Sequence, residues 1–94
     1  MKIDVEHHPE RGEFVVTIDG LRSQLRYERV GDEVLDLRST FVHRDLRGRT
    51  VGIQLVRSAL DYARAQGYRV IPTCWFVETV VERYPDYRDL LVTR

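Results

Sequence analysis

The residues best suited to chemistry lie in one stretch of the chain, "FVHRDLRGRTVGIQLV" at 41–56. Arg47 and Arg49 flank Gly48, and Gly52 follows shortly after. Guanidinium groups are strong, often bidentate phosphate donors, and small residues let a backbone close around an oxyanion. Two interpretations fit these residue types. One is an ordinary turn with solvated charges, and the other is a phosphate-binding loop at the start of a helix.

The spacing in this stretch does not match the best-known phosphate motifs. A Walker A loop ends in Gly-Lys-Ser/Thr, and a dinucleotide fingerprint needs GxGxxG. Neither pattern occurs at 41–56. The motif by itself therefore leaves both interpretations open.

Cys74 is the second candidate, because it lies just after Pro72 at or near the start of a predicted helix. A helix N-terminus favours the thiolate, which is the nucleophilic form of cysteine. The alternative is a small buried apolar side chain, as is common for a lone cysteine. A single cysteine cannot form an internal disulfide, which fits a reducing compartment.

The remaining polar candidates carry weaker signals. His7 and His8 are adjacent on a predicted strand and so face opposite sides, which is poor geometry for chelation. With one cysteine and no spaced pair of histidines or carboxylates, no metal site is expected. His43 is expected to be a solvated loop residue. Asp36 lies between apolar residues of a strand and is expected to pair with Arg38 or another arginine.

The first forty residues predict four strands joined by short turns. The strands are expected around Ile3 and Val5 and at 14–19, 21–30 and 33–42, with Asp19-Gly20 marking a tight hairpin. In the fourth, strict alternation would put the odd-numbered residues from 33 to 41 on one face and the even-numbered residues from 34 to 42 on the other. This pattern predicts an antiparallel meander.

The second half of the chain changes to helical periodicity. Apolar residues recur at helical spacing over 51–63, and Gly67 is placed to end that helix. A short fifth strand follows at 68–72, then a helix at 74–84 that Pro85 stops, and a last helical turn with Leu90 and Leu91. The order ββββαβα predicts an α+β fold with helices packed on the sheet. Because a helix joins the fourth and fifth strands, those two should be parallel.

Length and composition limit the class of protein. The 94 residues, 43% apolar and 32% charged, predict one small globular domain spanning 1–94. A formal net charge of zero argues against a general nucleic-acid binder. No apolar run is long enough for a membrane span, and the N-terminus lacks a signal-peptide core. We therefore expect a cytoplasmic protein with no membrane or nucleic-acid partner, acting as a monomer or weak dimer.

Three segments taken together resemble a known family. "VLDLRSTFVHRDLRGRTVGIQL", "YRVIPTCWFV" and "ERYPDYRDLL", in this order, are similar to the minimal, cysteine-containing branch of the GNAT N-acetyltransferase superfamily. The resemblance covers about 33–91, and the strand order of the first thirty residues is compatible with it. It implies a GNAT-like fold in which the parallel fourth and fifth strands splay apart.

The resemblance also implies a cofactor, acetyl-CoA, and the residues that hold it. The pantetheine arm would lie in the notch between the splayed strands and bond to the backbone around Thr40, Phe41 and Val42. The pyrophosphate would sit on the following turn. The residues placed there are Arg47, Gly48, Arg49, Thr50, Val51 and Gly52. Cys74 matches a cysteine that lies near the acetyl thioester in this branch.

Two positions depart from the family pattern. Thr50 replaces a glycine of the phosphate turn, and a positive φ would strain a threonine there. If Thr50 instead lies in the first helical turn, it is tolerated, and this is the conformation that we expect. Ser39 replaces a histidine that relatives commonly carry. If that histidine assists catalysis, its loss leaves no obvious base.

The function implied by the resemblance is acetyl transfer from acetyl-CoA to an amine. The amine would attack the thioester directly, helped by N–H groups of the fourth strand, or Cys74 would first accept the acetyl group. Larger members place two helices between the first two strands, where this chain has only "HPERGE". The acceptor face should thus be open, which favours an exposed protein lysine or N-terminus. The alternative is a non-catalytic acyl-CoA-binding regulator or sensor.

Overall fold

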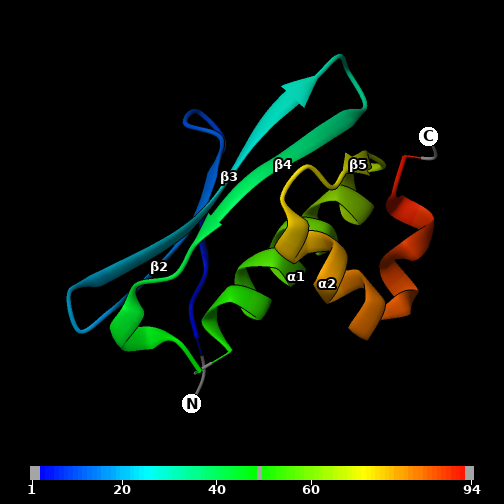
Figure 1. Cartoon of the computed structure of the whole chain (residues 1–94). Helices are drawn as coiled ribbons and strands as arrows, with labels where there is room; N and C mark the ends of the chain where they lie inside the picture. Colours follow the sequence, from blue (N-terminus) through cyan, green and yellow to red (C-terminus); the bar gives the residue numbers. More distant parts are fainter. Residues whose placement is uncertain (1–2, 49, 93–94) are drawn as a thin grey trace.

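The computed structural model describes residues 3–48 and 50–92 and arranges them around a five-stranded sheet (Figure 1). The strands lie in the sheet in chain order, and each pair is antiparallel except the last, in which β5 is parallel to β4. Their bounds are β1 Glu6–His8, β2 Glu13–Ile18, β3 Leu21–Val30, β4 Val34–Phe41 and β5 Arg69–Ile71. The predicted meander and the predicted parallel pair are both confirmed, but the first strand lies at Glu6–His8 and not around Ile3 and Val5.

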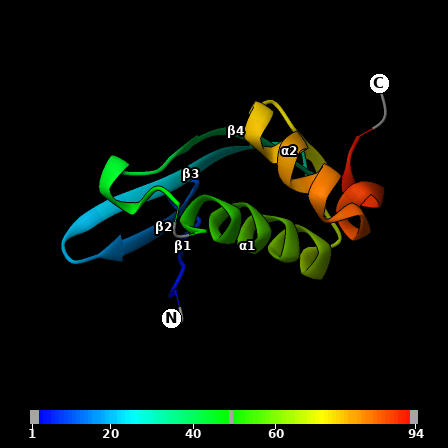
Figure 2. The same ribbon diagram turned by 60° about the horizontal axis from the view of Figure 1, so that its bottom comes forward.

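Two α-helices and two short 3₁₀ helices complete the described part of the chain. They are η1 Arg44–Leu46, α1 Val51–Gln66, α2 Trp75–Arg83 and η2 Pro85–Leu90. Helix α1 runs along one side of the sheet and contacts β2, β3, β4 and β5 (Figure 2). It also contacts α2 and η2. The order of the elements is the predicted ββββαβα with 3₁₀ turns added.

The hairpin between β2 and β3 forms at the predicted place. Asp19 has φ 52° and Gly20 has φ 78°, so both central residues of the turn are left-handed. This is the backbone of a type I′ turn, whose twist matches that of the flanking strands. The sequence signal Asp-Gly therefore fixes the register of β2 on β3.

The core lies between α1 and the sheet. Apolar side chains recur every three or four residues along α1, and each is fully buried at Leu55, Val56, Ala59, Leu60 and Ala63. Burying a leucine or valine side chain stabilises the fold by about 1.5–3 kcal/mol. The helix ends at the predicted Gly67, whose left-handed backbone lets its N–H bond to the Ala63 and Arg64 carbonyls.

A β-bulge interrupts β4. Tyr27 of β3 pairs with Leu37, but the preceding residue, Arg26, pairs with Ser39. Arg38 is thus one extra residue in β4 with no partner in the register. An extra residue of this kind shifts every later side chain to the opposite face of the sheet.

The bulge makes the predicted alternation of β4 wrong beyond Arg38. Thr40 lies opposite Leu25, a core residue, and therefore shares the α1 face with Leu37 rather than the other face with Asp36. Ser39 turns to the face away from α1 and is exposed. Strict alternation could not reveal this change, because a bulge leaves no mark on the apolar pattern here.

The C-terminal segment is tied to α1 through Tyr87. The Tyr87 hydroxyl donates to Asp61 Oδ1 at 2.7 Å and accepts from Arg57 Nε at 3.4 Å. The Arg57 guanidinium also lies 4.5 Å from the centre of the Tyr84 ring. Leu90 of η2 is buried, which confirms the predicted last helical turn. These contacts give the "YPDY" motif a structural role.

An aromatic cluster beneath β1 buries His7. Its ring stacks on Phe14 with centroids 4.1 Å apart and meets Tyr62 edge-on at 4.4 Å. His7 Nε2 lies 2.6 Å from the Tyr27 hydroxyl oxygen, within hydrogen-bond distance. Burial lowers the pKa of His7 below its ordinary 6.5, because the charged imidazolium loses hydration. Folding therefore favours the neutral form of His7 over the charged form.

This cluster predicts a loss of stability in mild acid. The unfolded chain binds a proton at His7 more readily than the folded chain, so the free energy of unfolding falls as the pH drops below about 6.5. Urea unfolding between about pH 7.5 and pH 5 measures this slope. His7→Phe should flatten it, whereas His8→Phe, at the neighbouring position on the other face, should leave it in place. A His7→Phe protein with an unchanged slope would contradict the assignment.

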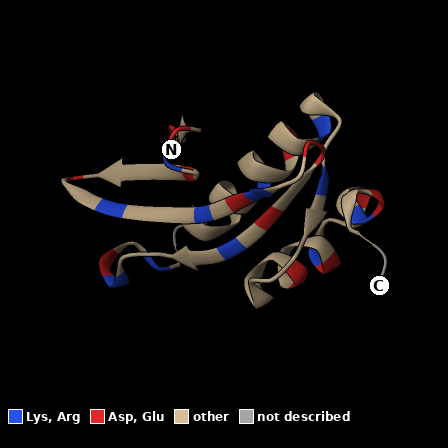
Figure 3. Cartoon of the chain, turned by 90° about the horizontal axis from the view of Figure 1, so that it is seen from above, with Lys and Arg blue, Asp and Glu red and all other residues tan. Residues whose placement is uncertain are grey.

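The distribution of charge is mixed over the described residues. Figure 3 shows acidic and basic positions interspersed along β3 and β4 rather than gathered on one side. No helix in the described ranges is long and apolar enough to cross a bilayer.

Candidate functional site

The parallel pair of strands separates after a short ladder. β5 pairs with β4 only from Val34 to Asp36, and the backbone N–H of Cys74 then donates to the Leu37 carbonyl at 2.9 Å. β4 continues to Phe41 beyond the end of this ladder. This is the predicted splay. It leaves backbone groups of β4 facing a gap instead of a neighbouring strand.

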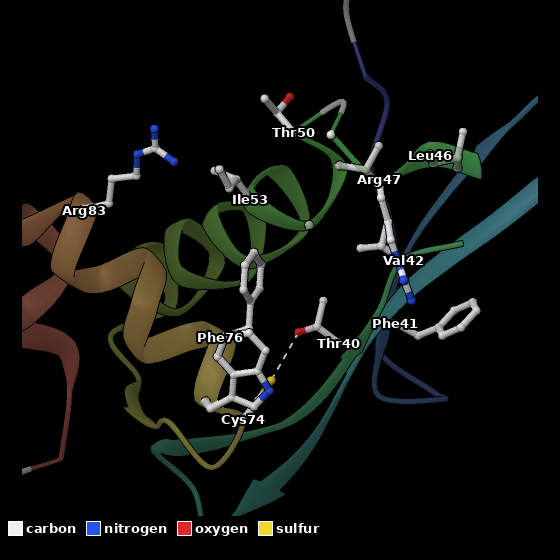
Figure 4. Close-up of a pocket in the computed structure, with 14 residues that line it drawn as sticks. Thr40, Phe41, Val42, Leu46, Arg47, Thr50, Ile53, Cys74, Phe76 and Arg83 are labelled. Carbon is white, nitrogen blue, oxygen red and sulfur yellow. Dashed lines mark hydrogen bonds between the residues drawn. The ribbon is translucent and has the colours of Figure 1, made fainter. Parts of the chain in front are cut away.

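A cleft of about 610 Å³ occupies this gap and extends to the start of α1 (Figure 4). Its walls come from the end of β4, the β4–α1 connection, the first turn of α1, and α2. The lining residues are Thr40, Phe41, Val42, Leu46, Arg47, Gly48, Thr50, Val51, Gly52, Ile53, Cys74, Trp75, Phe76 and Arg83. The volume is within the range usual for ligand sites, roughly 300–1,000 Å³.

The resemblance implied ten site residues, and the cleft brings nearly all of them together. Of the ten, nine line it, and these are Thr40, Phe41, Val42, Arg47, Gly48, Thr50, Val51, Gly52 and Cys74. The tenth, Arg49, lies outside the described residues. Residues up to 34 positions apart in the chain therefore share one cavity.

The N-terminus of α1 opens into the cleft. The first N–H of the helix with an intrahelical acceptor is that of Gln54, which donates to the Thr50 carbonyl at 2.9 Å. The N–H groups of Val51, Gly52 and Ile53 precede it and have no acceptor within the helix. The first turn contains no acidic residue, and the Thr50 side chain makes no capping hydrogen bond. N–H groups without an acceptor in the helix, together with the positive end of the helix dipole, suit an anion.

Thr50 does not have the backbone conformation that we expected. It precedes the helix as its N-cap, with φ 62° and ψ 12°, instead of lying in the first helical turn. The expectation of an unstrained threonine was therefore wrong. The position keeps the left-handed backbone that glycine adopts easily, although threonine occupies it.

Thr50→Gly should consequently stabilise the protein. Relief of the left-handed strain outweighs the extra entropy of the unfolded chain, and the free energy of unfolding should rise by about 1 kcal/mol. Urea unfolding measures the change. Thr79→Gly, within α2, is the matched control and should destabilise by a similar amount. A destabilised Thr50→Gly protein would show that the threonine side chain contributes more than its backbone costs.

The two positions in the cleft that carry glycine require it for different reasons. Gly48 has φ 85°, and a Cβ there would meet nothing within 4 Å, so its backbone conformation requires glycine. Gly52 is helical, but a Cβ there would lie 2.9 Å from Phe76 Cε2 and 3.2 Å from Val42 Cγ2. Gly52 therefore lets α1 approach both α2 and the end of β4.

Every charged residue among the described lining residues is an arginine. Arg47 and Arg83 lie on opposite sides of the cleft (Figure 4). Neither side chain forms an ion pair or hydrogen bond with another residue that the structure describes. In a chain of zero net charge, the cleft is thus locally positive.

Cys74 lies at the other end of the cleft from Thr50. It is the N-cap of α2 and 9% exposed, and its Sγ lies 3.6 Å from Thr40 Oγ1. Figure 4 shows the thiol and the Thr40 hydroxyl facing each other across the base of the cleft. A thiol so placed can reach a ligand that lies along β4.

Comparison with known proteins decides the family. A sequence model of the GCN5-related N-acetyltransferase family matches residues 13–90. The chain belongs to this family. The GNAT resemblance of the three motifs is thereby confirmed.

Relatives of this GNAT protein share most of its length. Protein NATD1 of Bos taurus is 36% identical over 85 residues, which span 88% of this chain and 75% of the relative. Protein NATD1 of Danio rerio is 30% identical over 86 residues, which span 89% and 78%. The solution structure of a GCN5-like protein from Staphylococcus aureus superposes with a TM-score of 0.74, covering 97% of this chain and 89% of the other. At 21% identity, that structure supports the fold alone.

In this GNAT protein a polar contact fixes the segment that precedes Cys74. The hydroxyl of Thr73 donates to Asp36 Oδ1, and Arg38 Nη1 donates to Asp36 Oδ2 at 3.2 Å. The predicted pairing of Asp36 with Arg38 is confirmed. The same carboxylate also anchors the residue next to Cys74, so Asp36 helps to hold the thiol against β4.

Ser39 and His43 do not line the GNAT cleft. Ser39 faces the other side of the sheet because of the bulge in β4. His43 is only partly exposed, and its Nδ1 accepts from the Asp45 N–H at 3.2 Å, which caps η1. The backbone N–H of His43 donates to the Ser23 hydroxyl at 2.9 Å, so this residue anchors the corner after β4.

Five lining residues of the GNAT cleft were not anticipated. They are Leu46, Ile53, Trp75, Phe76 and Arg83. Phe76 belongs to the helix predicted at 74–84, and its ring packs against Gly52. Trp75 lies next to Cys74 in the sequence and is 73% exposed, and its neighbour Cys74 was the one signal in the sequence that pointed to it.

Proposed function

We propose that this protein transfers the acetyl group of acetyl-CoA to an amine, and that the cleft between β4 and α2 holds the cofactor. The observation that carries this proposal is the polarity of the cleft. The N-terminus of α1 lies at one end, Arg47 and Arg83 line opposite sides of the cleft, and a thiol lies at the other end (Figure 4). CoA has the same polarity, with phosphates at one end and a thioester at the other.

The cofactor would lie in the cleft in one orientation. Its diphosphate would accept hydrogen bonds from the backbone N–H groups of Val51, Gly52 and Ile53 and from Arg47, with Gly48 allowing close approach. Arg49 belongs to the same proposed set. The pantetheine arm would run along the unpaired edge of β4 at Thr40, Phe41 and Val42. The thioester would then reach Cys74.

The chemistry we propose for Cys74 is covalent acyl transfer. The thiolate sulfur attacks the acetyl carbonyl, and the bond from that carbon to the CoA sulfur breaks. CoA leaves as a thiolate and is protonated. The acceptor amine then attacks the acetyl-cysteine and regenerates the thiol. Backbone N–H groups of β4 would stabilise the oxyanion in each step.

The acceptor side of the site is open. β1 and β2 are joined directly by a turn at 9–12, so no helix covers this edge. Trp75 and Phe41, which line the cleft, are 73% and 53% exposed. An open rim with exposed aromatic residues favours an amine on a macromolecule over an enclosed metabolite. We therefore propose a protein lysine or N-terminal amine as acceptor.

Thiol release from acetyl-CoA tests this function. The assay compares peptides with a free N-terminus, peptides with an internal lysine and a blocked N-terminus, and small amines such as spermidine. Acetylation of at least one class of peptide, detected by mass, supports the proposal. Release no faster than buffer hydrolysis with every acceptor, by a protein that binds CoA, would overturn it.

One observation favours a second candidate, a non-catalytic acyl-CoA sensor. No His, Asp or Glu is among the described residues that line the cleft, so the site holds no conventional base for the acceptor amine. Such a protein would bind CoA and acetyl-CoA without turnover. The same assay distinguishes it from the enzyme.

A further inference from the structure

Arg83 is a charged residue that lines the cleft from α2. The other positive groups of the proposed cofactor site come from the β4–α1 connection and the start of α1. Arg83 lies in the last turn of α2 and is exposed. Figure 4 shows its side chain extending from α2 toward Ile53, the third residue of α1. It thus approaches the phosphate end of the cleft from the side opposite Arg47.

Contacts within the protein do not explain the direction of this side chain. The nearby arginines of α1 are both engaged, since Arg57 bonds to Tyr87 and Arg64 forms two bonds to the Asp89 carboxylate. The Arg83 side chain forms no hydrogen bond or ion pair with another described residue. A cation in the last turn of a helix interacts favourably with the helix dipole, but this effect does not require it to project into a cleft.

We propose that Arg83 binds the 3′-phosphate of the adenosine half of CoA, an inference that rests on the proposed function. CoA carries a diphosphate and a separate phosphate monoester. The N–H groups of α1 and Arg47 already supply donors for the diphosphate. Arg83 stands across the cleft from Arg47, on the side where we place the adenosine half of the ligand (Figure 4). A guanidinium binds a phosphate monoester through two parallel hydrogen bonds.

The proposal makes Arg83 a specificity residue for CoA over 3′-dephospho-CoA. Calorimetric titration of both ligands into wild-type protein and Arg83→Gln gives four dissociation constants. We expect wild-type protein to prefer CoA by about 10-fold, which corresponds to about 1.4 kcal/mol. Arg83→Gln should lose this preference and keep its affinity for 3′-dephospho-CoA. The matched control is Arg88→Gln, which removes an exposed arginine of η2 that does not line the cleft.

The outcomes distinguish a failure of this inference from a failure of the proposed function on which it rests. If Arg83→Gln weakens both ligands equally, Arg83 acts on the shared diphosphate and the inference is wrong. Equal binding of both ligands by wild-type protein also overturns it. If wild-type protein binds neither ligand, the proposed function itself fails. Circular dichroism confirms that each variant is folded before titration.

Discussion

Replacing Arg47 with glutamate should weaken the binding of CoA about 100-fold. The arginine lines the cleft from the β4–α1 connection, and its side chain has no partner among the described residues, so its charge is available to a ligand. Glutamate would remove a charge-assisted hydrogen bond and add repulsion against the diphosphate. Isothermal titration calorimetry measures the change.

The chain offers a close control for this substitution. Arg44 lies three residues earlier in η1, its side chain is 85% exposed, and it does not line the cleft. Arg44→Glu changes the net charge by the same amount in the same region. It should weaken binding by no more than about 3-fold, through the long-range field that salt screens. Equal losses in the two variants would contradict a direct contact at Arg47.

Replacing Cys74 with alanine should reduce acetyl transfer on the order of 10³-fold or more while the affinity for CoA stays unchanged. The substitution removes the proposed nucleophile, and the truncated side chain leaves the cleft slightly larger. Mass spectrometry of wild-type protein incubated with acetyl-CoA alone should show an acetyl group on the peptide that contains Cys74.

Thr40→Val is the matched control for this experiment. It removes the hydroxyl that lies 3.6 Å from the thiol but keeps the side-chain shape, so the acetyl-enzyme should still form. If Cys74→Ala retains turnover, the covalent route is eliminated. Direct attack by the amine on the thioester would then be the mechanism.

The architecture followed from local signals that were strong in this chain. Asp19-Gly20 predicted the hairpin, the helical spacing of apolar residues predicted α1, and Gly67 predicted its end. The helix between β4 and β5 required a parallel pair, and that pair creates the cleft. The candidate site residues came from the GNAT resemblance, and the structure gathers nine of these ten residues in one cleft.

Two features of the site depend on backbone conformations that the residue types did not predict. Threonine gives no sequence signal for a positive φ, so the left-handed Thr50 was expected in the helix instead. The bulge at Arg38 moved Thr40 onto the α1 face, within reach of Cys74. Tertiary packing overrides local preference in both cases.

Residues from α2 were the hardest to assign. The sequence placed Phe76 and Arg83 in a predicted helix and gave no reason to direct either side chain toward α1. Their role in lining the cleft depends on how α2 packs against the first turn of α1, where Gly52 meets Phe76. The periodicity of apolar residues within one helix cannot reveal its contact with another helix.

The central claim is that the cleft binds CoA, and calorimetric titration of the wild-type protein with CoA tests it most directly. We expect saturable binding of one CoA per chain, with a dissociation constant in the micromolar range, roughly −7 to −8 kcal/mol. Arg47→Glu should abolish most of that heat. The absence of saturable binding at about 1 mM CoA, by folded protein, would contradict the claim and both functions that rest on it.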